Sequence, residues 1–141
     1  MLAETALPFE ETFDGLYGLE IVSMSDDEAR AQVVVRDAVK QVMGLVHGGV
    51  YAAMAEALTS MATGLVAFRD GNTAQGLSNS TSYVRPILAG TIHATARARH
   101  RGRTTWVWDV EFHDDQQRLC AISRITVAVR PNPGAQPAQP G

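Results

Sequence analysis

Two groups of residues near the middle of the chain have types and a spacing suited to catalysis. Gly48 and Gly49 follow His47 where the longest helical pattern begins. The first N–H groups of a helix have no internal acceptor and lie at the positive end of the helix dipole, and glycine lets a ligand approach them closely. This position therefore favours an anion or a developing oxyanion. A tight turn into the helix is the simpler use of two glycines, and we expect His47 to hold that turn rather than to act as a base.

Glu56 is the second candidate, because it is a single carboxylate inside a helix of apolar and small residues. Burying a carboxylate costs several kcal/mol unless it has a partner or a water-lined cavity. Such a setting is typical of a catalytic base or nucleophile. A structural hydrogen bond to loop backbone is the alternative that the residue type leaves open.

The spacing of these two groups carries a prediction of its own. Glu56 follows Gly48 by eight residues, which is about 12 Å along a helix that rises 1.5 Å per residue. A glutamate side chain leans toward the helix N-terminus but covers less than half of that distance. If both groups act in one reaction, they cannot come from one chain. The spacing then predicts an active site between antiparallel helices of two chains, with two sites per dimer.

The helix that carries both groups is expected over about residues 49–68, with Gly71 in a capping position after it. Residues at spacings of three and four give it one apolar face, made of Val50, Met54, Ala57, Leu58, Met61, Leu65 and Phe68. The opposite face, with Ala52, Glu56, Thr59 and Thr63, is small or weakly polar rather than charged. A helix of this kind is predicted to be buried nearly all round.

Strand patterns lie on both sides of this helix. A hairpin is predicted over residues 19–24 and 29–35, and four further strands over residues 73–83, 91–101, 104–113 and 119–130. The simplest way to bury one helix among six strands is an α+β fold in which a curved antiparallel sheet wraps around the helix. Residues 1–130 would form this domain, and a disordered Pro/Gly-rich tail would occupy residues 131–141.

The composition limits the classes of function. A chain of 141 residues with 45% hydrophobic residues is expected to form one globular domain. Its net charge of −3 argues against a nucleic-acid partner. The single cysteine, Cys120, excludes an internal disulfide and suits a cytoplasmic location. We expect no signal peptide and no membrane span. We also expect no metal site, because the remaining histidines, His93, His100 and His113, lack metal-ligand spacing.

With these motifs the sequence resembles the hotdog-fold acyl-CoA thioesterases of the PaaI-like group, and within it the 4-hydroxybenzoyl-CoA thioesterases whose carboxylate lies inside the helix. The matching segments span about residues 13–131; they are Gly44-Leu45-Val46-His47-Gly48-Gly49, Ala55-Glu56 and residues 79–86, 104–109, 118–121 and 128–131. The resemblance implies hydrolysis of an aromatic acyl-CoA, such as a 4-hydroxybenzoyl or phenylacetyl thioester. It implies a catalytic homodimer and a homotetramer. It also implies that the reaction needs no cofactor, since coenzyme A is part of the substrate.

The resemblance also implies a role for individual residues. The Gly48 amide would donate to the thioester carbonyl, and Gln41 would help to hold the thioester. Glu56 of the partner chain would be the nucleophile or the general base, which sequence does not decide. Ser60, one turn after Glu56, or Thr59 beside it would orient the lytic water.

Coenzyme A carries phosphates, so an acidic protein needs local basic residues to hold it. The resemblance implies that Arg85, Arg103, Thr104 and Thr105 lie near the nucleotide. Further candidates alternate along one predicted strand, where a solvated face would show the same pattern; they are Arg97, Arg99 and Arg101.

Two other classes of function stay open at this point. A hotdog dehydratase or hydratase would use a catalytic histidine, for which His47 is a poor match. A non-catalytic acyl-CoA-binding protein would bind the same ligand without turnover, and it would normally carry a segment for DNA or a protein partner.

Overall fold

The computed structural model describes residues 6–134 of the chain. Its elements follow one another as η1 (Phe9–Glu11), α2 (Phe13–Tyr17), β1 (Glu20–Met24), β2 (Glu28–Val34), η2 (Asp37–Val39), α3 (Gly48–Ala67), η3 (Phe68–Asp70), β3 (Asn72–Tyr83), β4 (Thr91–Arg101), β5 (Thr105–His113) and β6 (Leu119–Pro131). The long helix and all of the predicted strands are present close to their expected bounds.

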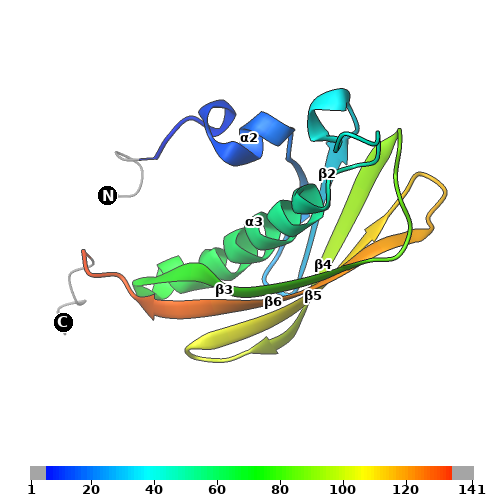
Figure 1. The fold of residues 1–141 in the computed structure, drawn as a ribbon. Coiled ribbons are helices and arrows are strands. Elements are labelled where there is room, and N and C mark those ends of the chain that lie inside the picture. The colour runs from blue at the N-terminus through cyan, green and yellow to red at the C-terminus, as the bar shows by residue number, and fades with distance from the viewer. Residues whose placement is uncertain (1–5, 135–141) are drawn as a thin grey trace, which may run out of the picture.

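The strands form one antiparallel sheet in the order β1-β2-β4-β5-β6-β3. Figure 1 shows this sheet curving around α3, while α2 lies on the far side of the helix from the sheet. The predicted α+β hotdog architecture is therefore confirmed. Strand β3 pairs only with β6, so β3 and β1 are the two edges of the sheet in the described part of the chain.

The core lies between the inner face of the sheet and one side of α3. Met54 of the helix is fully buried against this face, to which alternation along β5 brings the side chains of Trp108 and Phe112. On β4 the predicted small apolar face is also found, since Ala94 and Ala96 are buried. Each large side chain buried in this way stabilises the fold by about 1.5–3 kcal/mol.

The residues of α3 that pack into the core come from both of its predicted faces. Thr59 and Thr63, assigned to the weakly polar face, lie fully inside the core. Their hydroxyls donate to the carbonyls of Ala55 and Thr59 at 2.8 Å, and the indole N–H of Trp108 donates to the Thr63 hydroxyl at 3.0 Å. A threonine whose hydroxyl bonds to the preceding turn packs much like an apolar residue.

The far end of the predicted apolar face is instead open to solvent. Leu65 and Phe68 are 40% and 52% exposed in the single chain. The apolar composition of the helix predicted that it is buried nearly all round, but one part of its surface is exposed in the single chain. The segment Gly48–Asp70 is long and apolar enough to cross a membrane, but 56% of its apolar 18-residue stretch is buried within the fold, as in the core helix of a domain.

The C-terminal boundary of the domain differs slightly from the prediction. Strand β6 runs to Pro131, which pairs with Asn72, and the N–H of Asn132 donates to the carbonyl of Gly71 at 3.0 Å. The first residues of the predicted disordered tail, Pro131 and Asn132, are thus ordered against the start of β3 and the turn before it. Residues 135–141 of that tail lie outside the described residues.

Candidate active site

The start of α3 is held by His47, as expected. Its N–H donates to the carbonyl of Val39 at 2.9 Å, and its Nδ1 accepts from the N–H of Gly49 at 2.8 Å, which caps the helix. A side chain at position 49 would meet this ring at 3.0 Å, so the cap needs Gly49. Within residues 6–134, the N–H of Gly48 has no acceptor. It is therefore a free donor at the positive end of the helix.

Tyr83, at the end of β3, completes the surroundings of Gly48. Its hydroxyl donates to the Gly48 carbonyl at 3.1 Å, and a Cβ at position 48 would lie 2.8 Å from its ring. Sequence analysis missed Tyr83, although the segment of residues 79–86 that resembles the family contains it. These residues line a cavity of about 440 Å³ together with Gln41, Leu45, Val46, Tyr51, Val84, Arg85 and Pro86.

Gln41 reaches this cavity from a loop that is ordered by its own hydrogen bonds. Its N–H donates to the carbonyl of Leu45 at 2.8 Å, and its side-chain carbonyl accepts from the N–H of Met43. Gly44 closes the turn with a φ of +88°, which favours glycine. The side-chain amide N–H₂ of Gln41 has no acceptor in the described part of the chain, so it is free to donate to a ligand.

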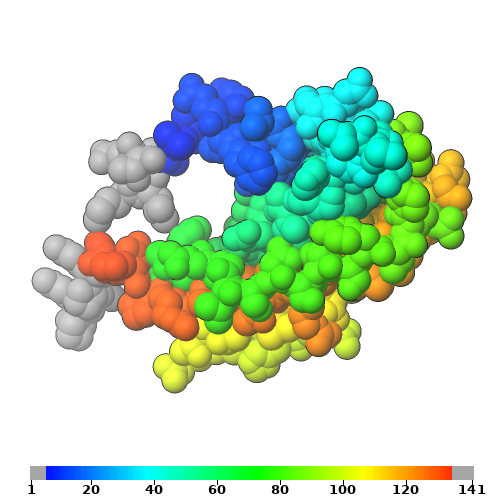
Figure 2. Space-filling view, viewed as in Figure 1, coloured from blue at the N-terminus to red at the C-terminus, as the bar shows by residue number. Residues whose placement is uncertain are grey.

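Glu56 lies on another side of α3, in a different environment. Sequence analysis expected a buried carboxylate, but the side chain is exposed in the single chain. Figure 2 shows the reason, since this part of α3 is open between α2 and β3. Among the described residues the carboxylate has no hydrogen bond or ion pair. It borders one cavity of about 380 Å³ with Thr12, Phe13, Asp14, Ala53 and Ala57, and one of about 200 Å³ with Gly76, Leu77, Ser78 and Asn79.

Two residues near Glu56 that sequence analysis had not singled out hold these walls in place. The side-chain amide of Asn79 donates to the carbonyl of Ala52 at 2.9 Å, which ties β3 to α3. On the other wall, the hydroxyl of Tyr17 donates to Asp14 at 2.7 Å. Burial, this hydrogen bond and the charges of Asp14 and Glu56 raise the pKa of Tyr17, so its phenol stays neutral.

The two hydroxyls proposed to orient water lie in different places. Thr59 is fully buried and its hydroxyl is bonded to Ala55. Ser60 is only partly buried at the residue level, and its Oγ is shielded but has no hydrogen-bond partner among the described residues. Of the two, only the Ser60 hydroxyl lacks a partner within the described residues, and it is shielded from solvent in the single chain.

Gly48 and Glu56 therefore form two separate half-sites. Of the cavities described here within residues 6–134, none is lined by both residues. Because α3 is continuous from Gly48 to Ala67, the two residues are about 12 Å apart along its axis. One chain cannot bring both groups to the same carbonyl.

The residues expected to bind coenzyme A are also divided. Arg85 lies beside Gly48, where its N–H donates to the carbonyl of Cys120 at 3.1 Å. Arg103 and Thr104 form the turn before β5, and Thr105 is the first residue of that strand. Across the sheet, Thr105 is level with Gln75 of β3, because both residues pair with Ala128 of β6. Gln75 and Tyr83 are eight residues apart on β3, or about 26 Å. The structure does not bring Arg85 and the residues 103–105 together in one chain.

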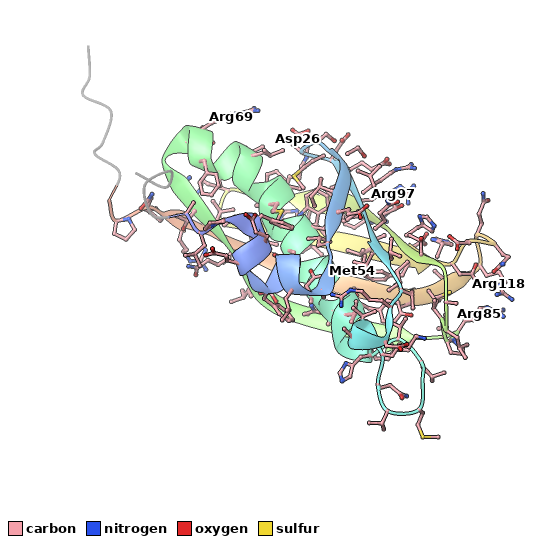
Figure 3. The ribbon with its side chains drawn as sticks, turned by 90° about the horizontal axis from the view of Figure 1, so that it is seen from above. Asp26, Met54, Arg69, Arg85, Arg97 and Arg118 are labelled. Atoms are coloured by element: carbon pink, nitrogen blue, oxygen red, sulfur yellow. The ribbon has the colours of Figure 1, made fainter. Side chains whose placement is uncertain are left out.

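The arginines that alternate along β4 are not free to bind phosphate. Arg97 pairs with Glu28 at 3.4 Å, Arg99 with Asp109 at 3.5 Å and Arg101 with Asp26 at 2.9 Å. Figure 3 shows Arg97 and Asp26 among the side chains on this outer face of the sheet. The pattern belongs to a solvated, charge-balanced strand face.

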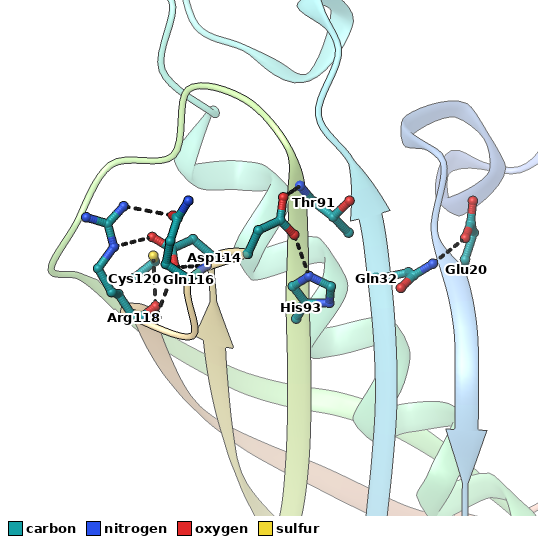
Figure 4. Close-up of polar contacts among 9 residues, drawn as sticks. Glu20, Gln32, Thr91, His93, Asp114, Gln116, Arg118 and Cys120 are labelled. Atoms are coloured by element: carbon teal, nitrogen blue, oxygen red, sulfur yellow. Dashed lines mark hydrogen bonds and ion pairs between the residues drawn. The ribbon is translucent and has the colours of Figure 1, made fainter.

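The hairpin between β5 and β6 supports the first half-site from behind. Asp114 accepts from the N–H groups of Gln116 and Arg118 and from the Arg118 guanidinium at 2.8–3.0 Å, as Figure 4 shows. Burial acts to raise the pKa of Asp114, but these hydrogen bonds and the arginine charge lower it overall. Cys120 is buried, and burial raises the pKa of its thiol, so it is a core residue rather than a nucleophile.

A further cavity of about 470 Å³ lies behind His47. Its lining is mainly apolar and comes from Phe13, Leu16, Tyr17, Arg36, Ala38, Val39, Lys40, Gly49 and Val50. Neither Gly48 nor Glu56 lines it. Although it is the largest of the cavities described above, we do not assign it to the reaction, because the free N–H and the free carboxylate lie elsewhere.

Comparison with known proteins identifies the class. Residues 43–121, more than half of the chain, match the family model described as the thioesterase superfamily. The proofreading thioesterase EntH of Cronobacter turicensis is 37% identical over 112 residues, which are 79% of this chain and 81% of that protein. The 1,4-dihydroxy-2-naphthoyl-CoA hydrolase of Listeria monocytogenes is 34% identical over 113 residues, which are 80% of this chain and 91% of that protein.

The solved structures agree. A mutant of the thioesterase PA1618 from Pseudomonas aeruginosa superposes with a TM-score of 0.84 at 32% identity and covers 88% of this chain and 89% of that one. The chain belongs to the thioesterase superfamily and is a thioester hydrolase. This answers the choice between a hydrolase, a dehydratase and a non-catalytic binding protein in favour of the hydrolase.

Proposed function

We propose that the chain hydrolyses an aromatic acyl-CoA to the free acid and coenzyme A, in a site to which two chains contribute. The observation that carries the proposal is the division of the reactive groups on α3. A free N–H of Gly48 and a free carboxylate of Glu56 lie in separate cavities about 12 Å apart along the helix. One cavity supplies the hydrogen-bond donor for the carbonyl oxygen, and the other supplies the carboxylate that the hydrolysis needs.

The edge strand β3 supports a particular pairing of the two chains. An unpaired edge is a ready template for a strand of a second copy, and a two-fold axis makes that pairing antiparallel. If the axis passes through Ser80, so that this residue lies opposite its own copy, Leu77 of one chain faces Tyr83 of its partner, and Gly76 is the next residue along the strand. Gly76 contacts Glu56, and Tyr83 contacts Gly48. This register would therefore bring Glu56 of one chain to Gly48 of the other.

The proposed reaction follows from these groups. The Gly48 N–H donates to the thioester carbonyl oxygen and stabilises the oxyanion as it develops. Glu56 of the partner subunit either attacks the carbonyl carbon, which gives an anhydride that water then hydrolyses, or removes a proton from a water that attacks directly. In both routes the C–S bond breaks, water supplies the oxygen of the free acid, and the coenzyme A sulfur takes up a proton that comes from water. Ser60 of the partner subunit orients the water, and Gln41 donates to the thioester. The reaction uses no metal or further cofactor.

The same two-fold arrangement gathers the residues proposed to bind coenzyme A. Antiparallel pairing of β3 places the Gln75 end of one chain beside the Tyr83 end of the other. The turn with Arg103 and Thr104, followed by Thr105, would then approach Arg85 of the partner. Arg130 of β6, to which sequence analysis gave no role, reaches this turn, because its guanidinium donates to the Thr104 carbonyl at 2.9 Å. The catalytic homodimer would form part of the expected homotetramer in the cytoplasm.

The cavity beside Glu56 supports an aromatic acyl group. Phe13 offers a ring at its wall, and Ala53 and Ala57 leave room for a flat group against the helix. The name of the Listeria relative specifies a naphthoyl-CoA, which is an aromatic thioester. We infer that a benzoyl- or phenylacetyl-sized ring, such as that of 4-hydroxybenzoyl-CoA, occupies this cavity.

A panel of acyl-CoAs, followed by release of free thiol, tests the function. We expect benzoyl-, 4-hydroxybenzoyl- and phenylacetyl-CoA to be hydrolysed with a higher kcat/KM than straight-chain acyl-CoAs of similar size. Glu56→Gln is the matched control for background hydrolysis. A preference for straight chains would contradict the aromatic assignment alone, whereas no hydrolysis above the control with any thioester would overturn the proposed reaction.

A further inference from the structure

Glu56 is positioned without a polar partner. No hydrogen bond or ion pair to its carboxylate occurs within residues 6–134, yet its side chain lies against one backbone position of β3. A Cβ built on Gly76 would be 2.9 Å from Oε1, 3.1 Å from Cγ and 3.3 Å from the carboxyl carbon of Glu56. The Glu56 side chain therefore occupies the space that any side chain at position 76 would need.

The backbone does not explain the glycine at position 76. The glycines with positive φ among the described residues are Gly18, Gly44, Gly71 and Gly90, so the conformation of Gly76 is open to other residues. Glycine inside a strand is also unfavourable, because it loses more conformational freedom than other residues and adds no side-chain packing. The structural role that we assign to Gly76 is to leave space for the Glu56 side chain.

The neighbouring part of β3 fixes the distance between this strand and the helix. The pairing of β3 with β6 shifts by one residue between Gly76 and Ser78, a bulge that changes the direction of the side chains that follow. Beyond the bulge, Asn79 donates to the carbonyl of Ala52, one turn before Glu56, at 2.9 Å. The Thr81 hydroxyl donates to the Asn79 side-chain oxygen at 2.8 Å and so orients the amide. The wall that Glu56 contacts is thus held on the helix itself.

We propose that Gly76 is a positioning residue for the thioester hydrolysis, whose missing side chain lets the Glu56 carboxylate lie where it meets the substrate held by the partner chain. The inference rests on the proposed catalytic role of Glu56. The atoms that a new side chain would strike first belong to the end of a flexible, exposed glutamate rather than to backbone. A small substitution at position 76 therefore displaces the carboxylate while the fold adapts.

The test is Gly76→Ala, with Gly64→Ala as the matched control. Gly64 lies two turns after Glu56 on α3, and a methyl group there meets the mobile end of Phe68 at 3.1 Å instead of the carboxylate. We expect Gly76→Ala to lower kcat about 10- to 100-fold, since misplacing a catalytic group by about 1 Å can cost about 100-fold. KM and the melting temperature should stay close to those of the wild type. Gly64→Ala should leave kcat unchanged.

A second pair of variants shows whether the effect passes through Glu56. In a Glu56→Ala background, Gly76→Ala should cause no further loss of the residual rate. If Gly76→Ala alone folds poorly, removal of the Glu56 side chain should restore its melting temperature, because that side chain is what the methyl group strikes. Full kcat for Gly76→Ala, a further loss in the double variant or an unrestored melting temperature would each overturn the inference. Near-normal kcat for Glu56→Ala alone would instead overturn the proposed function.

Discussion

The two half-sites on α3 are built in opposite ways. At the start of the helix, the free N–H of Gly48 is aimed by backbone and side-chain hydrogen bonds from His47 and Tyr83, all within one chain. Two turns later, Glu56 is exposed, has no polar partner among the described residues and lies against Gly76. A hydrogen-bond donor must point accurately at a developing charge, whereas a carboxylate must also reach a reactant. The first half-site is therefore complete in one chain, and the second becomes complete only beside a partner.

Glu56→Gln gives the largest expected effect and tests the second half-site directly. We expect kcat to fall about 1000-fold, because the amide can neither attack nor accept the proton of water. The free energy of unfolding should change by less than about 0.5 kcal/mol, since the side chain is exposed and unpaired. Steady-state hydrolysis and urea unfolding provide both values. Near-normal turnover of every acyl-CoA would remove Glu56 from the mechanism.

Gly48→Val tests the first half-site and should have the next largest effect. The new side chain would strike the ring of Tyr83, since even a Cβ lies 2.8 Å from it, and would crowd the N–H that faces the carbonyl oxygen. We expect kcat to fall about 100-fold, as for loss of one oxyanion donor. Tyr83→Phe keeps the ring and loses only the hydrogen bond to the Gly48 carbonyl, so it should lower kcat by much less than Gly48→Val. Equal kcat for Gly48→Val and the wild type would show that the oxyanion lies elsewhere.

Mixing two inactive variants tests whether the half-sites meet between chains. Glu56→Ala chains keep a good Gly48, and Gly48→Val chains keep a good Glu56. After subunit exchange at equal concentrations, about half of the dimers are mixed and each mixed dimer holds one intact site of two. The mixture should recover about a quarter of the wild-type rate. Native mass spectrometry can establish the exchange, and exchanged chains that stay inactive would confine each site to one chain.

Variants of Ser60 and Thr59 test which of the two hydroxyls takes part in the reaction. Ser60→Ala should lower kcat about 10-fold, because it removes the hydroxyl proposed to orient the water, which has no other partner among the described residues. Thr59→Val should leave kcat within about two-fold, since that hydroxyl already donates to Ala55 inside the core. Comparison of kcat and melting temperature for the two variants separates the roles. A larger loss of kcat in Thr59→Val would reverse the assignment.

Asp114→Asn should have the smallest effect on turnover, because it acts behind the first half-site. The pKa of Asp114 is lowered in the folded chain, so its charge stabilises the fold above its ordinary pKa of about 3.9, and this contribution is lost as pH falls through the lower, folded value. The variant should be less stable than the wild type at pH 7, and the difference should shrink toward about pH 3. Urea unfolding across this range measures it, and a difference that grows in acid would contradict the ion pair with Arg118.

Parts of the fold and of the candidate site follow from local sequence. The alternation of residues 91–101 predicted a strand, and Gly48 and Gly49 predicted the start of the long helix. Both predictions depend only on neighbours in the chain, and both were confirmed. The side of α3 that meets the sheet was harder, because Thr59 and Thr63 satisfy their hydroxyls within the helix and then pack like apolar residues. Arg97, Arg99 and Arg101 resemble a phosphate site until strand pairing sets acidic residues beside them.

The sequence by itself determined that one long helix carries both Gly48 and Glu56 and that their spacing exceeds the reach of a side chain, because helix rise is a property of the backbone. Only the tertiary structure decided which groups are free. It places Tyr83 on Gly48 and Gly76 on Glu56, contacts between residues more than 15 positions apart in the chain. Such contacts depend on how β3, at the edge of the sheet, lies along the helix, as Figure 1 shows, and no local pattern encodes them.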